Sequence, residues 1–302
     1  MNIIRMTGGM GNQMFQYALY LKLCSLGRTV KFDDISEYDR PGVRPIMLWA
    51  FDIDYPRATR EEINEITDGF MKFSDRVRRK LFGRRSKEYY EKSCNFDEQV
   101  LIREPAYLTG YFQSEKYFKD IDKQVRTAFT FSENIWQGAD DPLKGRMEEY
   151  LKRIQSTVSV AVHIRRGDYL EKDAIYGGIC TEEYYKKAID FFEKKEPEAV
   201  FFLFSNDPKW VSKWIQDNYE DVSRFVVVKG NMEDTGYLDM FLMSRCRHYI
   251  IANSSFSWWG AWLGCGEDKM VIAPSRWSKN QQYIDIYTEK MIKVTAKGDL
   301  VR

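Results

Sequence analysis

Two adjacent arginines follow a strand-like run near the middle of this 302-residue chain. Residues 158–164 read Val-Ser-Val-Ala-Val-His-Ile, and residues 165–168 continue Arg-Arg-Gly-Asp. A guanidinium stays charged and offers paired donors that match phosphate or carboxylate oxygens. A lone arginine in this place more often forms a surface ion pair, here with Asp168 or Glu171. His163 together with both arginines at one strand end instead favours an anion-binding site.

Polar side chains also follow two further strand-like runs, 199–205 and 248–253. The residues in question are Asn206 and Asp207 after the first run, and Asn253, Ser254, Ser255 and Phe256 at the end of the second. In a parallel sheet the carboxyl ends of strands share one edge, so we expect these residues to converge on 165–168. Serine hydroxyls and a helix N-terminus suit a pyrophosphate, while an amide and a carboxylate suit a nucleoside. Plain helix capping by Asp207, Asn253 or Ser254 is the alternative.

A glycine-rich turn opens the chain. Residues 8–13 read Gly-Gly-Met-Gly-Asn-Gln and connect an expected strand, 2–6, with a helical run, 12–26. Bare backbone N–H groups there could face an anion or a sugar. The turn lacks the third glycine of a dinucleotide fingerprint and the lysine of a P-loop, so a tight structural turn is an equally weighted interpretation.

The alternation of strand and helix patterns predicts an α/β protein with two Rossmann-like domains. We expect the boundary in the polar stretch 138–145, which gives domains 1–145 and 146–302. The order of elements in 35–97 stays open. Expected strands are 2–6, 29–33, 158–164, 199–205, 225–229, 248–253 and 270–274, and expected helices are 12–26, 181–195, 208–219, 235–245 and 254–263.

Composition excludes several classes of function. Acidic and basic residues nearly cancel, with a net charge of +1, so nothing global indicates a nucleic-acid partner. Two histidines and five dispersed cysteines offer little for a metal site. The chain shows neither a secretory signal nor an apolar run of about 18 residues, and we expect a cytoplasmic protein.

One segment, 72–87, carries eight Lys or Arg residues against a single acid, Asp75. Apolar residues are interleaved with the basic ones. We favour a helix with one buried apolar stripe and a solvated basic face. Peripheral association with an anionic membrane is the alternative.

Four blocks of the chain, in order, resemble the signature blocks of bacterial α-1,2-fucosyltransferases, glycosyltransferase family 11. They are Gly8-Gly9-Met10-Gly11-Asn12-Gln13-Met14-Phe15-Gln16, Gly110-Tyr111-Phe112-Gln113-Ser114, His163-Ile164-Arg165-Arg166-Gly167-Asp168-Tyr169 and Asn253-Ser254-Ser255-Phe256-Ser257-Trp258-Trp259. The resemblance implies a GT-B-type fold with two Rossmann-like domains facing across a cleft. It also implies GDP-L-fucose as co-substrate, no required metal or cofactor, and inverting transfer to the 2-hydroxyl of a terminal β-galactose.

The resemblance assigns roles to residues on both sides of the implied cleft. Arg165 and Arg166 would hold the diphosphate, with Arg165 stabilising charge on the leaving GDP. The nucleoside would contact His163, Asn206 and Asp207. The distal phosphate would contact Ser254, Ser255 and the amide of Phe256, near Asn253. The acceptor side or cleft would contain Gly9, Gly11, Asn12, Gln13, Tyr111 and Gln113.

The general base and the acceptor are the least constrained features. Asp168 is the first candidate base, with Glu171 and Asp173 behind it, although Asp168 could instead pair with an arginine. A related transferase with another donor or linkage is the alternative within the same class. A nucleotide- or glycan-binding module without catalysis is the alternative from a different class. The acceptor is expected to be a galactose-terminated oligosaccharide or a lipid-linked glycan.

Overall fold

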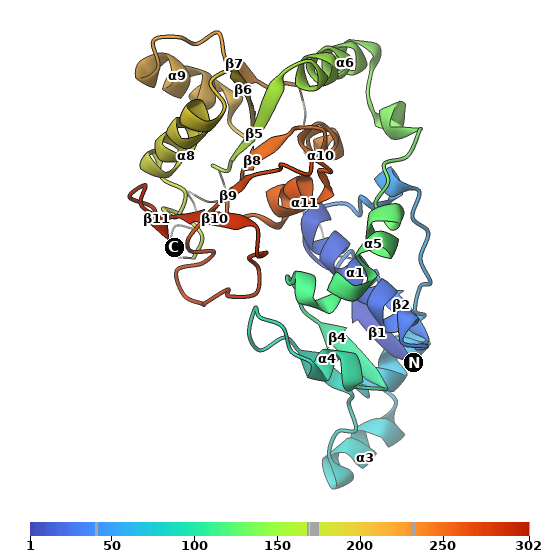
Figure 1. The fold of residues 1–302 in the computed structure, drawn as a ribbon. Helices are drawn as coiled ribbons and strands as arrows, with labels where there is room; N and C mark the ends of the chain where they lie inside the picture. The colour runs from blue at the N-terminus through green and yellow to red at the C-terminus, as the bar shows by residue number, and fades with distance from the viewer. Residues whose placement is uncertain (40–41, 168, 170–174, 231–233, 302) are drawn as a thin grey trace. The chain divides into compact units, whose positions relative to one another are not determined.

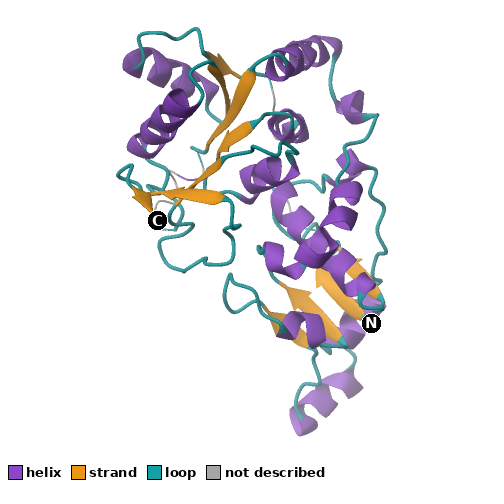
Figure 2. Ribbon diagram, viewed as in Figure 1, coloured by secondary structure: helices purple, strands orange, loops and turns teal. Residues whose placement is uncertain are grey.

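The computed structural model describes residues 1–39, 42–167, 169, 175–230 and 234–301. The chain divides into two compact units, Met1–Thr130 (unit 1) and Phe131–Arg302 (unit 2). Each unit has its own mainly parallel sheet with helices packed on it (Figures 1 and 2). The predicted α/β fold with two Rossmann-like domains is therefore confirmed. Within the described residues, every helix is too short or too polar to span a bilayer.

Unit 1 is built on a four-stranded sheet in the order β2-β1-β4-β3. Its elements are β1 Asn2–Arg5, α1 Met10–Ser25, β2 Val30–Asp33, α2 Arg60–Thr67, α3 Phe73–Phe82, β3 Glu88–Tyr90, α4 Gln99–Ile102, β4 Ala106–Thr109 and α5 Asp122–Ala128, with 3-10 turns at Leu48–Phe51, Glu115–Tyr117 and Lys119–Ile121. Helix α1 covers the sheet face that carries Phe32, whose ring lies 5.2 Å from that of Tyr20. Helix α2 covers the opposite face, where Ile66 packs with Ile3.

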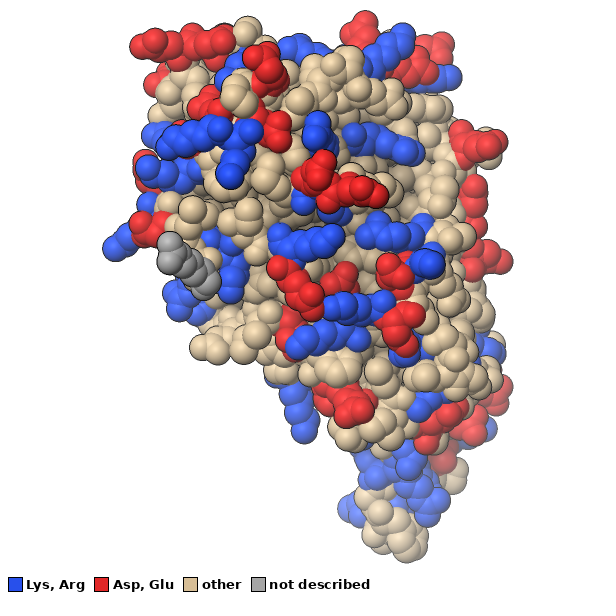
Figure 3. Space-filling view, in the orientation of Figure 1, with Lys and Arg blue, Asp and Glu red and all other residues tan. Residues whose placement is uncertain are grey.

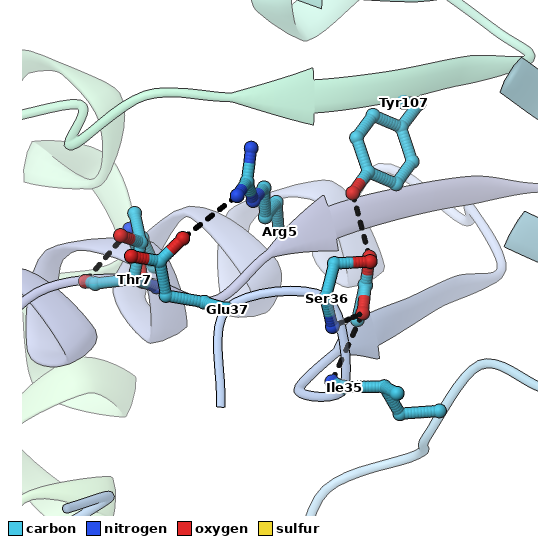
Figure 4. A network of polar contacts seen from close by, with 8 residues as sticks. Arg5, Thr7, Ile35, Ser36, Glu37 and Tyr107 are labelled. Carbon is cyan, nitrogen blue, oxygen red and sulfur yellow. Dashed lines mark hydrogen bonds and ion pairs between the residues drawn. The ribbon is translucent and has the colours of Figure 1, made fainter. Parts of the chain in front are cut away.

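A buried carboxylate anchors the carboxyl edge of the unit 1 sheet (Figure 4). Asp33 is fully buried and accepts hydrogen bonds from the Tyr107 hydroxyl at 2.6 Å and the Ser36 hydroxyl at 2.6 Å. The backbone N–H groups of Ile35 and Ser36 also donate to it. Burial alone would raise the pKa of Asp33, but these hydrogen bonds to the charged form outweigh it and lower the pKa.

Unit 2 is built on a seven-stranded sheet in the order β11-β10-β9-β8-β5-β6-β7, parallel except for the β10–β11 pair. Its elements are α6 Asp141–Gln155, β5 Val158–Ile164, α8 Glu182–Lys195, β6 Ala199–Ser205, α9 Pro208–Asn218, β7 Phe225–Val227, α10 Gly236–Ser244, β8 His248–Ile250, α11 Ser255–Leu263, β9 Val271–Pro274, β10 Met291–Val294 and β11 Leu300–Val301, with a 3-10 turn at Ile135–Gly138. Helices α8 and α9 pack on one face, against the side chains of Val162 and Leu203. Helices α6, α10 and α11 lie on the other face (Figure 1).

Local sequence explains why these elements form where they do. Strand β5 is buried on both faces and rich in valine, as expected of a central parallel strand. Helix α8 begins after Thr181, whose hydroxyl accepts the Tyr184 N–H at 3.2 Å. Acidic residues follow in its first turn and lysines in its last, in agreement with the helix dipole.

Two features differ from the sequence predictions. The division between units falls after Thr130, earlier than the predicted boundary at 145. Helix α6 begins within the polar stretch where the boundary was expected, because Asp140 caps the Leu143 N–H at 2.8 Å and Pro142 fits the first turn. The expected buried stripe of the basic segment is also wrong, since α3 buries none of its residues.

We expect Tyr107→Phe to destabilise the protein by about 2 kcal/mol at neutral pH, because it removes a hydrogen bond to a buried charge. The pKa of Asp33 is lowered in the folded state, so the stabilisation is fully present above the unfolded-state pKa and is lost as the pH falls through the folded-state pKa. Urea unfolding at neutral and acidic pH measures both effects. Tyr90→Phe is the control, because the Tyr90 hydroxyl donates to Glu88 at an exposed position. Equal losses in the two variants would contradict the prediction.

Candidate functional site

Strands β8, β5 and β6 are neighbours in the unit 2 sheet, and their carboxyl ends therefore lie at one edge. The loops that follow these strands begin at residues 251, 165 and 206. The predicted convergence of the three strand ends is confirmed. The contacts at this edge decide how each predicted residue is held.

Asn206 fixes the backbone of the arginine pair. Its side-chain oxygen accepts the Arg166 N–H at 2.9 Å, and its side-chain nitrogen donates to the Arg166 carbonyl at 3.0 Å. Gly167 completes the turn with a φ of +61°, and a Cβ there would lie 2.6 Å from the Asn206 side-chain nitrogen. Asn206 thus positions the loop that carries the arginines, a role that the sequence did not suggest.

Arg166 is held by an aromatic ring and a carboxylate. Its guanidinium lies 3.8 Å from the centroid of the Trp210 ring, and its Nε lies 3.5 Å from an Asp207 carboxylate oxygen. Asp207 also caps α9 by accepting the Trp210 N–H at 3.1 Å. The alternative interpretation of Asp207 as a helix cap is therefore confirmed. The stacked guanidinium is restricted to one plane, as bidentate recognition of an anion requires.

A cavity of about 220 Å³ opens beside the two arginines. Arg165, Arg166, Tyr169, Tyr185, Trp210 and Asn253 are among the residues that line it. The Arg165 guanidinium lies 5.6 Å from the Tyr169 ring centroid. The cavity thus combines two cations with aromatic walls and with the buried amide of Asn253.

Asn253 connects the edge of the sheet to two loops. Its side-chain nitrogen donates to the carbonyls of Tyr176 at 3.2 Å and Trp277 at 3.0 Å, while its backbone carbonyl accepts the Tyr169 hydroxyl at 2.9 Å. Trp277 lines a larger neighbouring cavity of about 510 Å³ formed by residues 275–284 with Tyr287 and Lys293. Asn253 is a buried positioning residue.

Ser254 stands at the start of α11, where the sequence offered two interpretations. Its side chain makes no capping hydrogen bond within the described residues. The Asn253 side chain is directed to neighbouring loops, so the expected capping by Asn253 or Ser254 is not observed. Ser255 and Phe256 form the first turn of α11 beside this position. A helix start favours anions through its N–H groups and its dipole.

His163 lies in β5, with 5% of its surface exposed, and its ring centroid is 5.7 Å from that of Phe256. Burial, together with the nearby Arg165 charge, lowers the pKa of His163 to about 3. Its Nδ1 is buried, and the described residues provide no hydrogen-bond partner for it. His163 is therefore a neutral imidazole whose Nδ1 the described residues leave unpaired.

The candidate bases Asp168, Glu171 and Asp173 lie outside the described residues. Among the residues that are described, no three His, Cys, Asp or Glu side chains gather in a way that could hold a metal ion. The site combines cations, aromatic rings, amides and a helix start with the Asp207 carboxylate.

The glycine turn of unit 1 is held by buried glutamines. Gln13 is fully buried, accepts the Met47 N–H at 2.9 Å and donates to the Gly8 and Pro45 carbonyls. Gln16 accepts the Thr7 N–H at 3.2 Å and donates to the Gly110 carbonyl at 2.9 Å. These side chains connect the turn to two other loops, so the interpretation of a structural turn accounts for Gln13.

Other predicted unit 1 residues meet at the same sheet edge. Asn12 accepts a hydrogen bond from Gln113 at 2.7 Å, which joins the start of α1 to the loop after β4. Gly9 is the N-cap of α1, and a Cβ there would lie 3.1 Å from the Arg44 guanidinium. Gly11 is buried in the first turn of α1. The structure therefore brings Gly9, Gly11 and Asn12 to one rim with Gln113.

Glu91 is a rim residue that sequence reasoning missed. Its carboxylate accepts the backbone N–H groups of Tyr111 at 2.8 Å and Phe112 at 3.1 Å. Phe112 has a φ of +53°, and Glu91 therefore holds a turn in a region that favours glycine. Burial raises the pKa of Glu91 to about 7, although the two N–H donors oppose the shift. A lone glutamate in an irregular segment gives no sequence signal for this role.

Sequence reasoning also missed Trp210, which stacks on Arg166. Its place in the first turn of a helix that follows a strand end is a signal that could have identified it as a site residue.

Comparison with known proteins adds independent findings. Residues 83–294 match the family model described as Glycosyl transferase family 11. The chain is 31% identical to an Escherichia coli protein named alpha-1,2-colitosyltransferase, over 97% of this chain and 98% of that protein. It is 32% identical to the O-antigen biosynthesis glycosyltransferase WbnK of E. coli, over 90% of this chain and 93% of that protein. It is 27% identical to the bovine galactoside alpha-(1,2)-fucosyltransferase 1, over 86% of this chain and 65% of that protein.

Solved structures give weaker matches. A crystal structure of POFUT1 in complex with GDP-fucose aligns with 91% of this chain and 97% of its own, at 10% identity and a TM-score of 0.46.

We expect Asn206→Ala to loosen the loop after β5 without unfolding the sheet. The variant removes both side-chain contacts to the Arg166 backbone, which should raise the hydrogen–deuterium exchange of residues 165–167 at least about tenfold, the equivalent of one modest hydrogen bond. Exchange in β5 itself should stay unchanged. Asn218→Ala is the control, because Asn218 also bonds a backbone carbonyl but lies at the end of α9. Unchanged exchange at 165–167 in Asn206→Ala would show that the Asn206 side chain does not hold this loop.

We also expect His163 to stay neutral from pH 5 to pH 8, because its pKa is lowered to about 3. The His163 imidazole contributes to the stability of the folded protein, and this contribution is fully present above the unfolded-state pKa of His163. It is lost as the pH falls toward the folded-state pKa. Nitrogen-15 NMR of the ring follows this directly, since the chain contains only two histidines. A titration midpoint near the ordinary histidine pKa would contradict the buried environment.

Proposed function

We propose a reaction for this chain, which belongs to glycosyltransferase family 11. In this reaction the chain transfers L-fucose from GDP-fucose to the 2-hydroxyl of a terminal β-galactose. The observation that carries the proposal is the Arg165–Arg166 pair at a cavity that Asn253 also lines, with the Arg166 backbone held by Asn206. The name of the bovine relative, a galactoside alpha-(1,2)-fucosyltransferase, supports this linkage and acceptor.

The charges at the sheet edge suit a leaving nucleoside diphosphate. As the bond between fucose and the β-phosphate lengthens, negative charge grows on the diphosphate oxygens. Arg165 and Arg166 would stabilise that charge from fixed positions, with Ser254, Ser255 and the Phe256 amide at the distal phosphate. Removal of one fixed donor of this kind typically costs about 3 kcal/mol of transition-state stabilisation. The neutral Nδ1 of His163 would contact the nucleoside.

Transfer with inversion is a single displacement. The acceptor 2-hydroxyl oxygen forms a bond to the anomeric carbon while the carbon–oxygen bond to the diphosphate breaks, and the hydroxyl proton passes to a base. We propose Asp168 as that base, with Glu171 and Asp173 as the next candidates. The diphosphate leaves as GDP with its charge held by the arginines. No step in this scheme needs a metal or a cofactor.

Unit 1 would supply the acceptor side. Tyr111 is partly exposed on the loop that Glu91 holds, and Gln113 lies beside it with its amide bonded to Asn12. An aromatic ring and polar amides are suited to the apolar face and the hydroxyls of a galactoside. Gln13 would act through the loops that it anchors, because it is fully buried.

A second donor is favoured by one comparison. The E. coli relative that matches almost the full chain is named for transfer of colitose. Colitose is fucose without its 3-hydroxyl group, so the same diphosphate contacts would serve both donors. Discrimination would then depend on whether the site hydrogen-bonds that hydroxyl.

We expect GDP release from GDP-fucose in the presence of EDTA to depend on lactose and to fall about 100-fold or more in Arg165→Ala, because a fixed donor to the developing charge is removed. Arg60→Ala is the matched control, since Arg60 forms an exposed ion pair with Asp39 in unit 1. Its rate should equal that of the wild type.

Other outcomes point to specific alternatives. Release that needs an added divalent metal would refute the metal-free mechanism. Turnover of GDP-colitose without turnover of GDP-fucose would establish the second donor. GDP binding without release on any galactoside would indicate a binding module and overturn the proposal.

A further inference from the structure

Helix α3 presents apolar side chains to solvent. Phe73 is 82% exposed, Leu81 68% and Phe82 73%. Phe73, Val77 and Leu81 follow one another at four-residue spacing and lie on one side of the helix, and Phe82 is exposed at its last position. We call these four residues the α3 stripe. Soluble proteins seldom expose such a row of large apolar side chains unless it has a partner.

Polar contacts, and not an apolar core, hold α3 in place. Asp68, at the end of α2, accepts a hydrogen bond from the Arg78 side chain and another from the Arg85 backbone N–H at 3.0 Å. Arg79 donates to the Asp68 carbonyl at 2.9 Å. No residue of α3 is buried. The stripe is therefore not used to attach the helix to unit 1.

Positive charge surrounds the stripe. The exposed cations of α3 and its flanks are Lys72, Arg76, Lys80, Arg84, Arg85 and Lys87. Asp75 is the single acid between residues 72 and 87. Figure 3 shows Lys and Arg side chains crowded at the end of unit 1 where Figure 1 places α3. The surface combines apolar side chains with cations and lies on a helix that extends away from the unit 1 sheet.

We propose that α3 docks the protein on an anionic lipid bilayer, with the stripe at the boundary between headgroups and acyl chains and the cations against lipid phosphates. A helix with phenylalanine and leucine on one side and many Lys and Arg around them is the usual form of an interfacial anchor. The cations are spread along the segment, which suits a continuous anionic surface better than a single bound ion. Helix α3 also lies outside the family match, which begins at residue 83.

The test is flotation of the full chain with vesicles of phosphatidylcholine alone or mixed with phosphatidylglycerol. The wild type should bind the anionic vesicles, and added salt should weaken binding. Phe73→Gln/Leu81→Gln/Phe82→Gln and Arg76→Gln/Lys80→Gln should each lower the partition coefficient at least about tenfold. Ile102→Gln/Ile284→Gln and Lys123→Gln/Lys152→Gln are the controls, because all four residues are exposed elsewhere and should matter little.

Several outcomes would overturn the proposal. They are no binding of the wild type to anionic vesicles, equal binding to both vesicle types, or equal losses in the control variants. A dimer in sedimentation velocity that the stripe variant dissociates would show that a second copy covers α3 instead. Transfer to soluble lactose should be unchanged in the α3 variants, which separates this proposal from the proposed activity.

Discussion

The site of unit 2 depends on two hydrogen bonds between the Asn206 side chain and the Arg166 backbone. Parallel strands bring β5 and β6 side by side, but strand pairing ends at Ile164 and Ser205. Asn206 continues the connection past the end of the sheet. Because it fixes the Arg166 backbone, the guanidinium can stack on Trp210 and meet Asp207. Any side chain at position 167 would collide with Asn206. The contact between Asn206 and the arginine loop therefore also requires glycine at this position.

Unit 1 uses the same principle with different residues. Gln13 and Gln16 fill the hydrogen-bonding needs of loops that would otherwise leave backbone groups buried and unpaired. Glu91 does the same for the turn after β4. Motif residues that look like candidates for ligand contact thus act partly by shaping the backbone, while Tyr111 is exposed on the same rim.

Sequence reasoning located strands β5 to β9 and helices α8 to α11 to within a few residues, because buried parallel strands are continuous apolar runs and Thr181 marks a helix start. It missed α6, β10 and β11. It missed β3 and β4, which are only three and four residues long and lie in a polar, irregular segment. Periodicity showed that α3 is amphipathic but could not show whether its apolar side is covered, because that depends on tertiary contacts. The pairing of Asn206 with Arg166 spans forty positions, and a single sequence holds no sign of it.

Asn253 has a consequence for the thermodynamics of binding. It is bonded to the loops at Tyr176 and Trp277, and it accepts the Tyr169 hydroxyl. These hydrogen bonds hold the Tyr169 hydroxyl and the backbone at Tyr176 and Trp277 in the folded protein. A ligand that enters the neighbouring cavity therefore meets residues that have already lost part of their conformational entropy. Less of the interaction energy is then consumed in ordering the protein, and more of it appears as affinity. The wall of the cavity is in this sense preorganised by one buried amide.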